Sequence, residues 1–156
     1  VRPFRGLTVL ENVEVGQLFG AVKEKNIRAA QNVAEDILKD VGLRDRSNIL
    51  AGSLTLAGLK RLEVAKALAT GPKLLLLDEV MAGLTASEVN EAIEIIRSCQ
   101  IKYGLTVIVI EHVMKALMRM CGRIVVLHHG EMIMIGKPDE VANDRAVINA
   151  YLGEGG

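Results

Sequence analysis

Two adjacent carboxylates, Asp78 and Glu79, are the strongest chemical signal in the sequence. They directly follow Leu74–Leu77, an aliphatic run typical of a parallel strand that is buried on both faces. Ligands of open α/β sheets bind at the carboxyl ends of such strands. One carboxylate there can hold Mg²⁺ and the other can orient or deprotonate an attacking water, as phosphoryl transfer requires. The alternative is a strand that ends in an acidic turn without chemistry.

A histidine follows the next aliphatic run in the same way. His112 comes after Ile108-Val109-Ile110-Glu111, which indicates a second buried strand. A lone histidine is more often structural than functional. This one, however, is expected at the same edge of a parallel sheet as Asp78 and Glu79, because parallel strands end on the same side. Its position therefore favours a functional role.

A third segment, Leu54-Thr55-Leu56-Ala57-Gly58, leads directly into a helical pattern. Small residues and a hydroxyl before a helix leave backbone N–H groups at the positive end of the helix dipole, where anions bind. Taken alone, the segment is better explained as an ordinary helix N-terminus that Thr55 caps. Its meaning depends on the elements around it.

The first seventy residues are predicted to be helical. Thr8 and Glu11 form a capping-box pattern for a short helix within Leu7–Val13, because each side chain can bond the other residue's backbone N–H. Apolar residues at helical spacing predict a second helix from about Asn26 to Val41 and a third over Lys60–Ala69.

After residue 70, strands alternate with helices, which is the pattern of a parallel sheet covered by helices. The predicted elements are, in order, the strand Leu74–Leu77, a helix capped by Thr85 and Glu88 and ended by Gly104, the strand Thr106–Ile110, a helix from Val113 to Met120, a hairpin of Ile124–Leu127 and Met132–Ile135 around Gly130, and a last helix that Asp144 begins and Gly153 ends. The fold class is therefore α/β.

Composition excludes several classes of protein. Lys plus Arg and Asp plus Glu are 19 each and aromatic residues are 3%, so neither a basic surface nor stacking platforms argue for nucleic acid. The apolar runs are far shorter than the roughly 20 residues that span a bilayer. Two cysteines without CxxC spacing, Cys99 and Cys121, are expected to be apolar core residues in a reducing compartment. These features predict a cytoplasmic protein.

The ordered set of motifs resembles the nucleotide-binding subunit of ABC transporters, and in particular the ATP-binding subunits of branched-chain amino-acid importers. The resemblance covers essentially the whole chain. The matching segments are Val1–Val13 after the family's glutamine loop, Leu54–Gly58 at the signature, Leu74–Glu79 at the Walker B strand, Ala82-Gly83-Leu84-Thr85 at the D-loop, His112 at the switch histidine, and the tail Arg123–Gly153.

The resemblance implies roles for these positions. Asp78 would coordinate Mg²⁺, Glu79 would polarise the attacking water and His112 would contact the γ-phosphate. The signature residues Leu54 to Gly58 would bind ATP held by a second ATPase subunit, Thr55 with its hydroxyl and Ala57 and Gly58 with their N–H groups. Mg²⁺ and ATP are thus the cofactors of a complete subunit.

The chain also departs from the family pattern. The signature has Thr55 for serine, Ala57 for glycine and Gly58 for glutamine, while Val80 replaces a common proline and Thr85 a common aspartate. No GxxxxGK[S/T] sequence, the loop that cradles phosphates, occurs in these residues. We therefore expect this stretch of chain to bind neither ATP nor Mg²⁺ by itself.

The resemblance implies a helical subdomain over residues 1–70 and the C-terminal half of a RecA-like core over 71–156. The expected partners are transmembrane permease subunits, so the protein would lie on the inner face of the cell membrane. The rival interpretation is a non-catalytic fragment that acts only by association with a full-length subunit. An ATPase of DNA repair or chromosome structure is disfavoured by the zero net charge and by the lack of coiled-coil heptads.

One structural expectation follows from the missing loop. In the family's sheet the phosphate-loop strand lies between the strand that ends at His112 and the strand Arg123–Leu127. Without it, we expect Thr106–Ile110 to pair directly with Arg123–Leu127, or to borrow a strand from another copy in a homo-oligomer.

Overall fold

The computed structural model describes residues 2–20 and 26–152. Its contacts divide the chain into two compact units, Val1–Glu111 and His112–Gly156, and each is described by itself. This division does not follow the subdomain boundary expected at residue 70, which concerns the family's architecture and stays a prediction.

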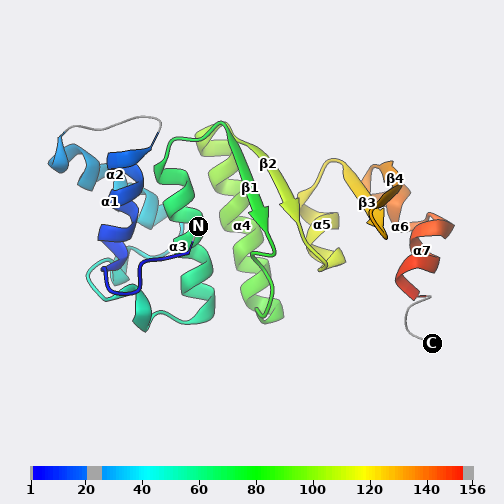
Figure 1. Ribbon diagram of the computed structural model, residues 1–156, viewed down its shortest axis with the longest axis horizontal. Coiled ribbons are helices and arrows are strands. Elements are labelled where there is room, and N and C mark those ends of the chain that lie inside the picture. Colours follow the sequence, from blue (N-terminus) through cyan, green and yellow to red (C-terminus); the bar gives the residue numbers. More distant parts are fainter. Residues whose placement is uncertain (1, 21–25, 153–156) are drawn as a thin grey trace. The chain divides into compact units, whose positions relative to one another are not determined.

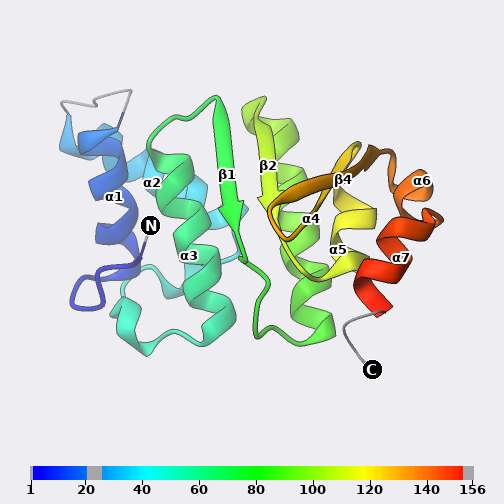
Figure 2. The same cartoon turned by 45° about the vertical axis from the view of Figure 1, so that its right-hand side comes forward.

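Helices form the first part of the first unit. They are α1 (Val9–Phe19), α2 (Ile27–Asp40) and α3 (Leu56–Ala69), with short 3₁₀ turns η1 (Arg44–Arg46) and η2 (Ala51–Ser53) between the last two. α1 contacts both α2 and α3, and the three lie side by side in Figures 1 and 2. Their shared core consists of buried aliphatic side chains, among them Val9, Val13, Ala34, Ile37, Leu38, Leu62 and Ala65.

Two of the predicted helix starts are confirmed, and the third helix begins earlier than predicted. Thr8 and Glu11 form the expected capping box, in which the Thr8 hydroxyl accepts from the Glu11 N–H. α3 begins at Leu56, four residues before the predicted start at Lys60. The reason is Thr55, whose side chain accepts a hydrogen bond from the Gly58 N–H and caps the helix there.

A two-stranded parallel sheet follows in the same unit. β1 (Leu74–Asp78) pairs with β2 (Thr106–Ile110), in register from Leu74 opposite Thr106 to Asp78 opposite Ile110. α4 (Ala86–Tyr103) connects them, because parallel strands need a long crossover. Figure 2 shows the two arrows pointing the same way with α4 beside them. As predicted, the capping box of Thr85 and Glu88 starts α4 and Gly104 ends it. Gly104 is in the left-handed conformation.

The prediction that both strands are buried on both faces is wrong for these residues. Leu75 and Leu77 are 4% exposed, but Leu76 is 66% and Ile110 62% exposed. Alternate side chains of a strand point to opposite faces. One face of the sheet is therefore packed, and the other leaves its aliphatic side chains open.

The second unit is a small α/β arrangement. It comprises α5 (Met114–Met120), β3 (Ile124–His128), β4 (Glu131–Gly136), α6 (Pro138–Ala142) and α7 (Arg145–Leu152). β3 and β4 form the predicted antiparallel hairpin. Its turn residues His129 and Gly130 both have positive φ, 48° and 83°, the backbone of a type I′ turn. Asp144 accepts from the N–H groups of Ala146 and Val147 and caps α7. The five-residue α6 was not predicted.

Within the units, β2 pairs with β1 and β3 pairs with β4. The pairing expected between Thr106–Ile110 and Arg123–Leu127 would join the two units and stays a prediction. Helices of the described part of the chain are all too short or too polar to cross a membrane.

Candidate functional site

The carboxylate pair lies at the carboxyl end of β1. Asp78 is the last residue of the strand, paired in register with Ile110, and both Asp78 and Glu79 are exposed. The Glu79 N–H donates to the Ile110 oxygen at 2.9 Å, so the parallel ladder continues one residue past the strand. Glu79 itself has φ 48°, a left-handed conformation that costs roughly 1–2 kcal/mol for a residue with a Cβ. The surroundings of Glu79 must hold this conformation in place.

Two side chains from neighbouring elements hold the loop that follows. The Lys60 Nζ donates to the Glu79 carbonyl oxygen at 3.0 Å, and the Glu111 Oε1 accepts from the Met81 N–H at 2.7 Å. A turn bond from the Ala82 N–H to the same Glu79 oxygen, 3.2 Å long, closes the loop. Neither Lys60 nor Glu111 was predicted to have a role, although Lys60 follows the signature segment and Glu111 precedes His112. Those neighbours in sequence were the available signal.

The predicted D-loop residues Ala82 to Thr85 connect this loop to α4. Gly83 has φ 78°, and a Cβ built on it would lie 3.0 Å from the Leu56 Cδ2. Leu56 belongs to the signature segment, so the structure brings these two segments together within one unit. Thr85 caps α4, and its N–H and hydroxyl both donate to Glu88. These bonds stabilise the charged carboxylate and lower the pKa of Glu88.

The signature segment forms the first turn of α3. Leu54 is buried, whereas Thr55 and Leu56 are exposed. Within the segment, the Gly58 N–H donates to the Thr55 Oγ1 at 3.2 Å. This is the capping role considered for Thr55, and it occupies two of the groups that the family resemblance assigns to ATP. The roles of Leu54 to Gly58 in binding nucleotide stay a prediction.

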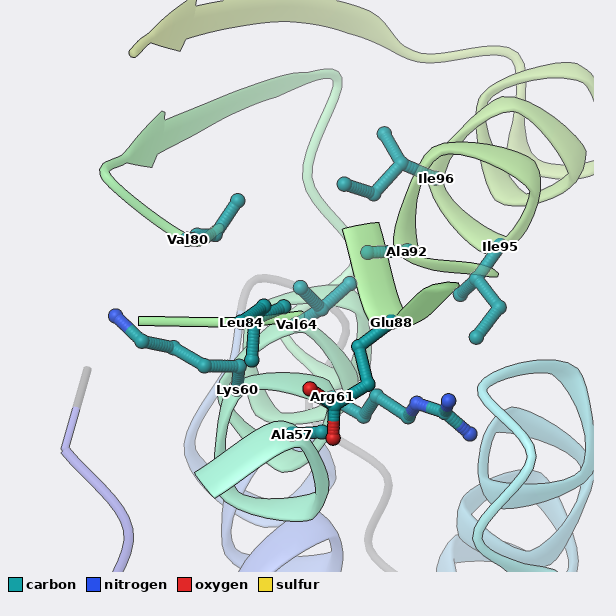
Figure 3. A pocket seen from close by; sticks show the side chains of 10 residues that line it. All are labelled: Ala57, Lys60, Arg61, Val64, Val80, Leu84, Glu88, Ala92, Ile95 and Ile96. Atoms are coloured by element: carbon teal, nitrogen blue, oxygen red, sulfur yellow. The ribbon is translucent and has the colours of Figure 1, made fainter. Parts of the chain in front are cut away.

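A pocket of about 350 Å³, including its open mouth, lies between α3, the Val80–Leu84 segment and α4. Figure 3 shows its lining, in which aliphatic side chains face inward while Lys60 and Arg61 leave in opposite directions. Lys60 reaches the Glu79 carbonyl, and Arg61 forms an ion pair with Glu91 of α4. The first turns of α3 therefore support the carboxylate loop on one side and α4 on the other.

His112 follows β2 by two residues and is the first residue of the second unit. It is exposed, and its role at the γ-phosphate stays a prediction from the sequence.

The donor set at β1 suits the magnesium role predicted for Asp78. Groups of three or more metal-binding side chains are absent from residues 2–20 and 26–152. Mg²⁺ needs no such group, because it keeps several waters and binds one or two carboxylates together with substrate phosphates. An exposed carboxylate at a strand end, such as Asp78, fits that mode of binding.

Comparison with known protein families gives two matches. Residues 1–82 match the family model described as ABC transporter. Residues 131–156 match the one described as branched-chain amino acid ATP-binding cassette transporter.

Similar curated proteins carry related names. The high-affinity branched-chain amino acid transport ATP-binding protein LivG is 38% identical in Escherichia coli K12 and 39% in Salmonella typhimurium, over 99% of this chain and 65% of theirs. The protein of the same description named BraF, from Pseudomonas aeruginosa, is 34% identical with the same coverage. The chain thus spans about 65% of the length of these relatives.

Solved structures show the same fold. An ATP-binding cassette of an ABC transporter in its ADP conformation matches with a TM-score of 0.81 and 24% identity, over 96% of this chain and 64% of that one. The protein cbiO1 from Clostridium perfringens, part of an ABC transporter complex, matches with a TM-score of 0.80 and 25% identity, over 96% and 62%. The predicted α/β fold with a RecA-like core, the P-loop NTPase fold, is confirmed.

Proposed function

The chain belongs to the ABC transporter family, and on this premise we propose that it is part of an ATP-binding subunit. In the complete protein this subunit would hydrolyse ATP to drive the import of branched-chain amino acids or similar solutes. Permease subunits in the membrane and a second ATPase subunit would be its partners.

The carboxylate pair at the end of β1 supports the ATPase role. We propose that Asp78 binds Mg²⁺, that Glu79 polarises the attacking water, and that His112 contacts the γ-phosphate. Both carboxylates are exposed where a substrate can reach them, and the Glu79 backbone is fixed by bonds to β2 and Lys60. Phosphoryl transfer requires catalytic groups in fixed positions, because positioning and charge stabilisation provide most of its catalysis.

The proposed solute rests on a separate observation. Residues 131–156 match the branched-chain amino acid family model, and the relatives named for this transport align with 99% of the chain. This support concerns the class of transporter, since solute choice lies with other subunits.

The test is ATP-driven uptake by the complete transporter in proteoliposomes. We expect ATP-dependent accumulation of labelled leucine, isoleucine or valine, lost when Glu79 is replaced by Gln. The matched control is Glu131→Gln, at the exposed start of β4. ATP hydrolysis without uptake of any of the three amino acids would contradict the proposed solute and support the proposed ATPase activity.

A non-catalytic role by association with a full-length subunit is the second candidate. It is favoured by the signature substitutions and by the Gly58 N–H, which already bonds Thr55. This candidate expects the native protein to bind its partner subunits without hydrolysing ATP. Residues 1–156 by themselves should not bind MgATP under either proposal, because no phosphate-cradling loop occurs in them. Calorimetric titration of that chain checks this, and micromolar binding at one site would contradict it.

A further inference from the structure

Glu111 has an unusual environment for a carboxylate. Its Oε1 accepts a 2.7 Å hydrogen bond from the Met81 N–H. Its Oε2 is buried and has no hydrogen-bond partner among the residues that the structure describes. A buried acceptor without a partner is costly, and the cost is greater for a charged group. An apolar side chain at position 111 would avoid that cost. A carboxylate at this position is therefore expected to have a role.

The bond that Glu111 does make lies close to the reactive carboxylate. Met81 is 1% exposed and two residues beyond Glu79. Its N–H lies in the loop whose turn bond joins the Ala82 N–H to the Glu79 oxygen. Glu111 and Met81 stand 30 residues apart in the chain, so the bond ties the loop to the end of β2. Release of the Met81 N–H would remove one restraint on the loop that follows Glu79.

We propose that Glu111 is a positioning residue, whose bond to the Met81 N–H fixes the loop after β1 and thereby aims the Glu79 carboxylate at the attacking water. The inference rests on the proposed ATPase function. Glu111 does not contact the reacting atoms. It acts through Glu79, from the residue after β2, while Lys60 restrains the Glu79 carbonyl oxygen from α3.

Kinetics of the complete subunit give the first test. Glu111→Ala should lower kcat by about 10–100-fold, the usual range for a group that orients a reactive residue. The KM for ATP should not change, because no bond to nucleotide is lost. Glu111→Gln keeps an oxygen that can accept from Met81 and should recover most of kcat. Glu131→Ala, at the hairpin, is the matched exposed control. Parental kcat in Glu111→Ala would overturn the inference.

A double-mutant cycle separates positioning from a structural effect. If Glu111 acts through Glu79, Glu111→Ala should cause little further loss in a Glu79→Gln protein. An equal loss in both backgrounds would show that Glu111 acts independently, and would overturn the inference.

Amide hydrogen exchange tests the tether without any ATPase activity. Peptides covering residues 80–84 should exchange faster in Glu111→Ala than in the parent, and at the parental rate in Glu111→Gln. Unchanged exchange in Glu111→Ala would overturn the inference. If the unsubstituted subunit hydrolysed no ATP, the proposed function would be contradicted. The exchange rates would still decide whether Glu111 fixes the loop.

Discussion

The Nζ of Lys60, on the first turns of α3, donates a hydrogen bond to the carbonyl oxygen of Glu79 at 3.0 Å. The bond joins the helix that begins with the signature segment to the backbone of the proposed catalytic carboxylate. Here a lysine side chain holds a peptide group directly. The orientation of the Glu79 side chain then follows from its backbone.

Replacement of Lys60 by Met should lower ATP turnover by about tenfold in the complete subunit, the low end of the range for orienting groups. Met keeps the apolar stem against the pocket and loses only the donor. Steady-state kinetics check this, with Lys73→Met, an exposed lysine just before β1, as the control. Equal turnover in the two variants would show that the bond does not matter for catalysis.

Replacement of Glu79 by Gln should lower turnover by about 10²–10⁴-fold while ATP binding persists, because general-base assistance is lost and the shape is kept. Turnover and equilibrium binding of ATP should be measured on the same preparation. Hydrolysis at the parental rate would exclude Glu79 as the base and make His112 the leading candidate.

Replacement of Gly83 by Ala should lower the free energy of unfolding by more than the same change at Gly104. Both glycines have positive φ, 78° and 61°, so both substitutions carry a backbone cost of about 1–2 kcal/mol. Only Gly83 has a close neighbour, because its Cβ would lie 3.0 Å from the Leu56 Cδ2 whereas Gly104 has open space. Urea unfolding of the two variants measures the difference. Additional replacement of Leu56 by Ala should relieve the excess, and an excess that remains would refute the contact.

Stability should fall with rising pH from about pH 9, the region where a free cysteine thiol ionises. Burial, and then the nearby charge of Asp40, raises the pKa of the Cys99 thiol from 9.0 to about 11. The unfolded chain therefore loses this proton at a lower pH than the folded chain. The folded chain gains stability by keeping the Cys99 proton. This contribution is fully present below pH 9 and is lost as the pH rises to about 11. The pKa of Tyr103, also raised by burial, adds to the loss at higher pH.

Urea midpoints at pH 8 and pH 10.5 measure this effect. Cys99→Ala should show a smaller decrease between the two pH values than the parent. Ser98→Ala, exposed on the same helix, should behave like the parent. A decrease of equal size in Cys99→Ala and in the parent would rule out the thiol as its source.

Local signals in the sequence predicted most helices and strands. Capping pairs such as Thr8 with Glu11 and Thr85 with Glu88 act within one turn, so their residues mark helix starts directly. The helix predicted over Lys60–Ala69 begins four residues earlier, at Leu56, where the cap considered for Thr55 marks the boundary. The prediction that β1 is buried on both faces was wrong. An aliphatic run indicates that a strand can be buried, but it does not show which elements pack against the strand.

The proposed reactive residues could be found from sequence because they stand at strand ends, but their supports could not. Lys60 and Glu111 contact the loop across 19 and 30 residues of chain, and neither spacing has a sequence signature. Their importance depends on the positive φ of Glu79, which the sequence does not reveal. Contacts from distant side chains to a backbone become visible only when the chain is folded.

The parallel pairing of β1 and β2 sets the order in which this loop can form during synthesis. The Met81 N–H finds its acceptor on Glu111, 30 residues later in the chain, and the Glu79 N–H finds its acceptor on Ile110. Both bonds require α4 to be made first, because a parallel strand returns only after its crossover. A nascent chain that has left the ribosome only as far as α4 thus carries both carboxylates without their working geometry. Under the proposed ATPase function, an unfinished subunit would therefore lack the geometry that hydrolysis requires.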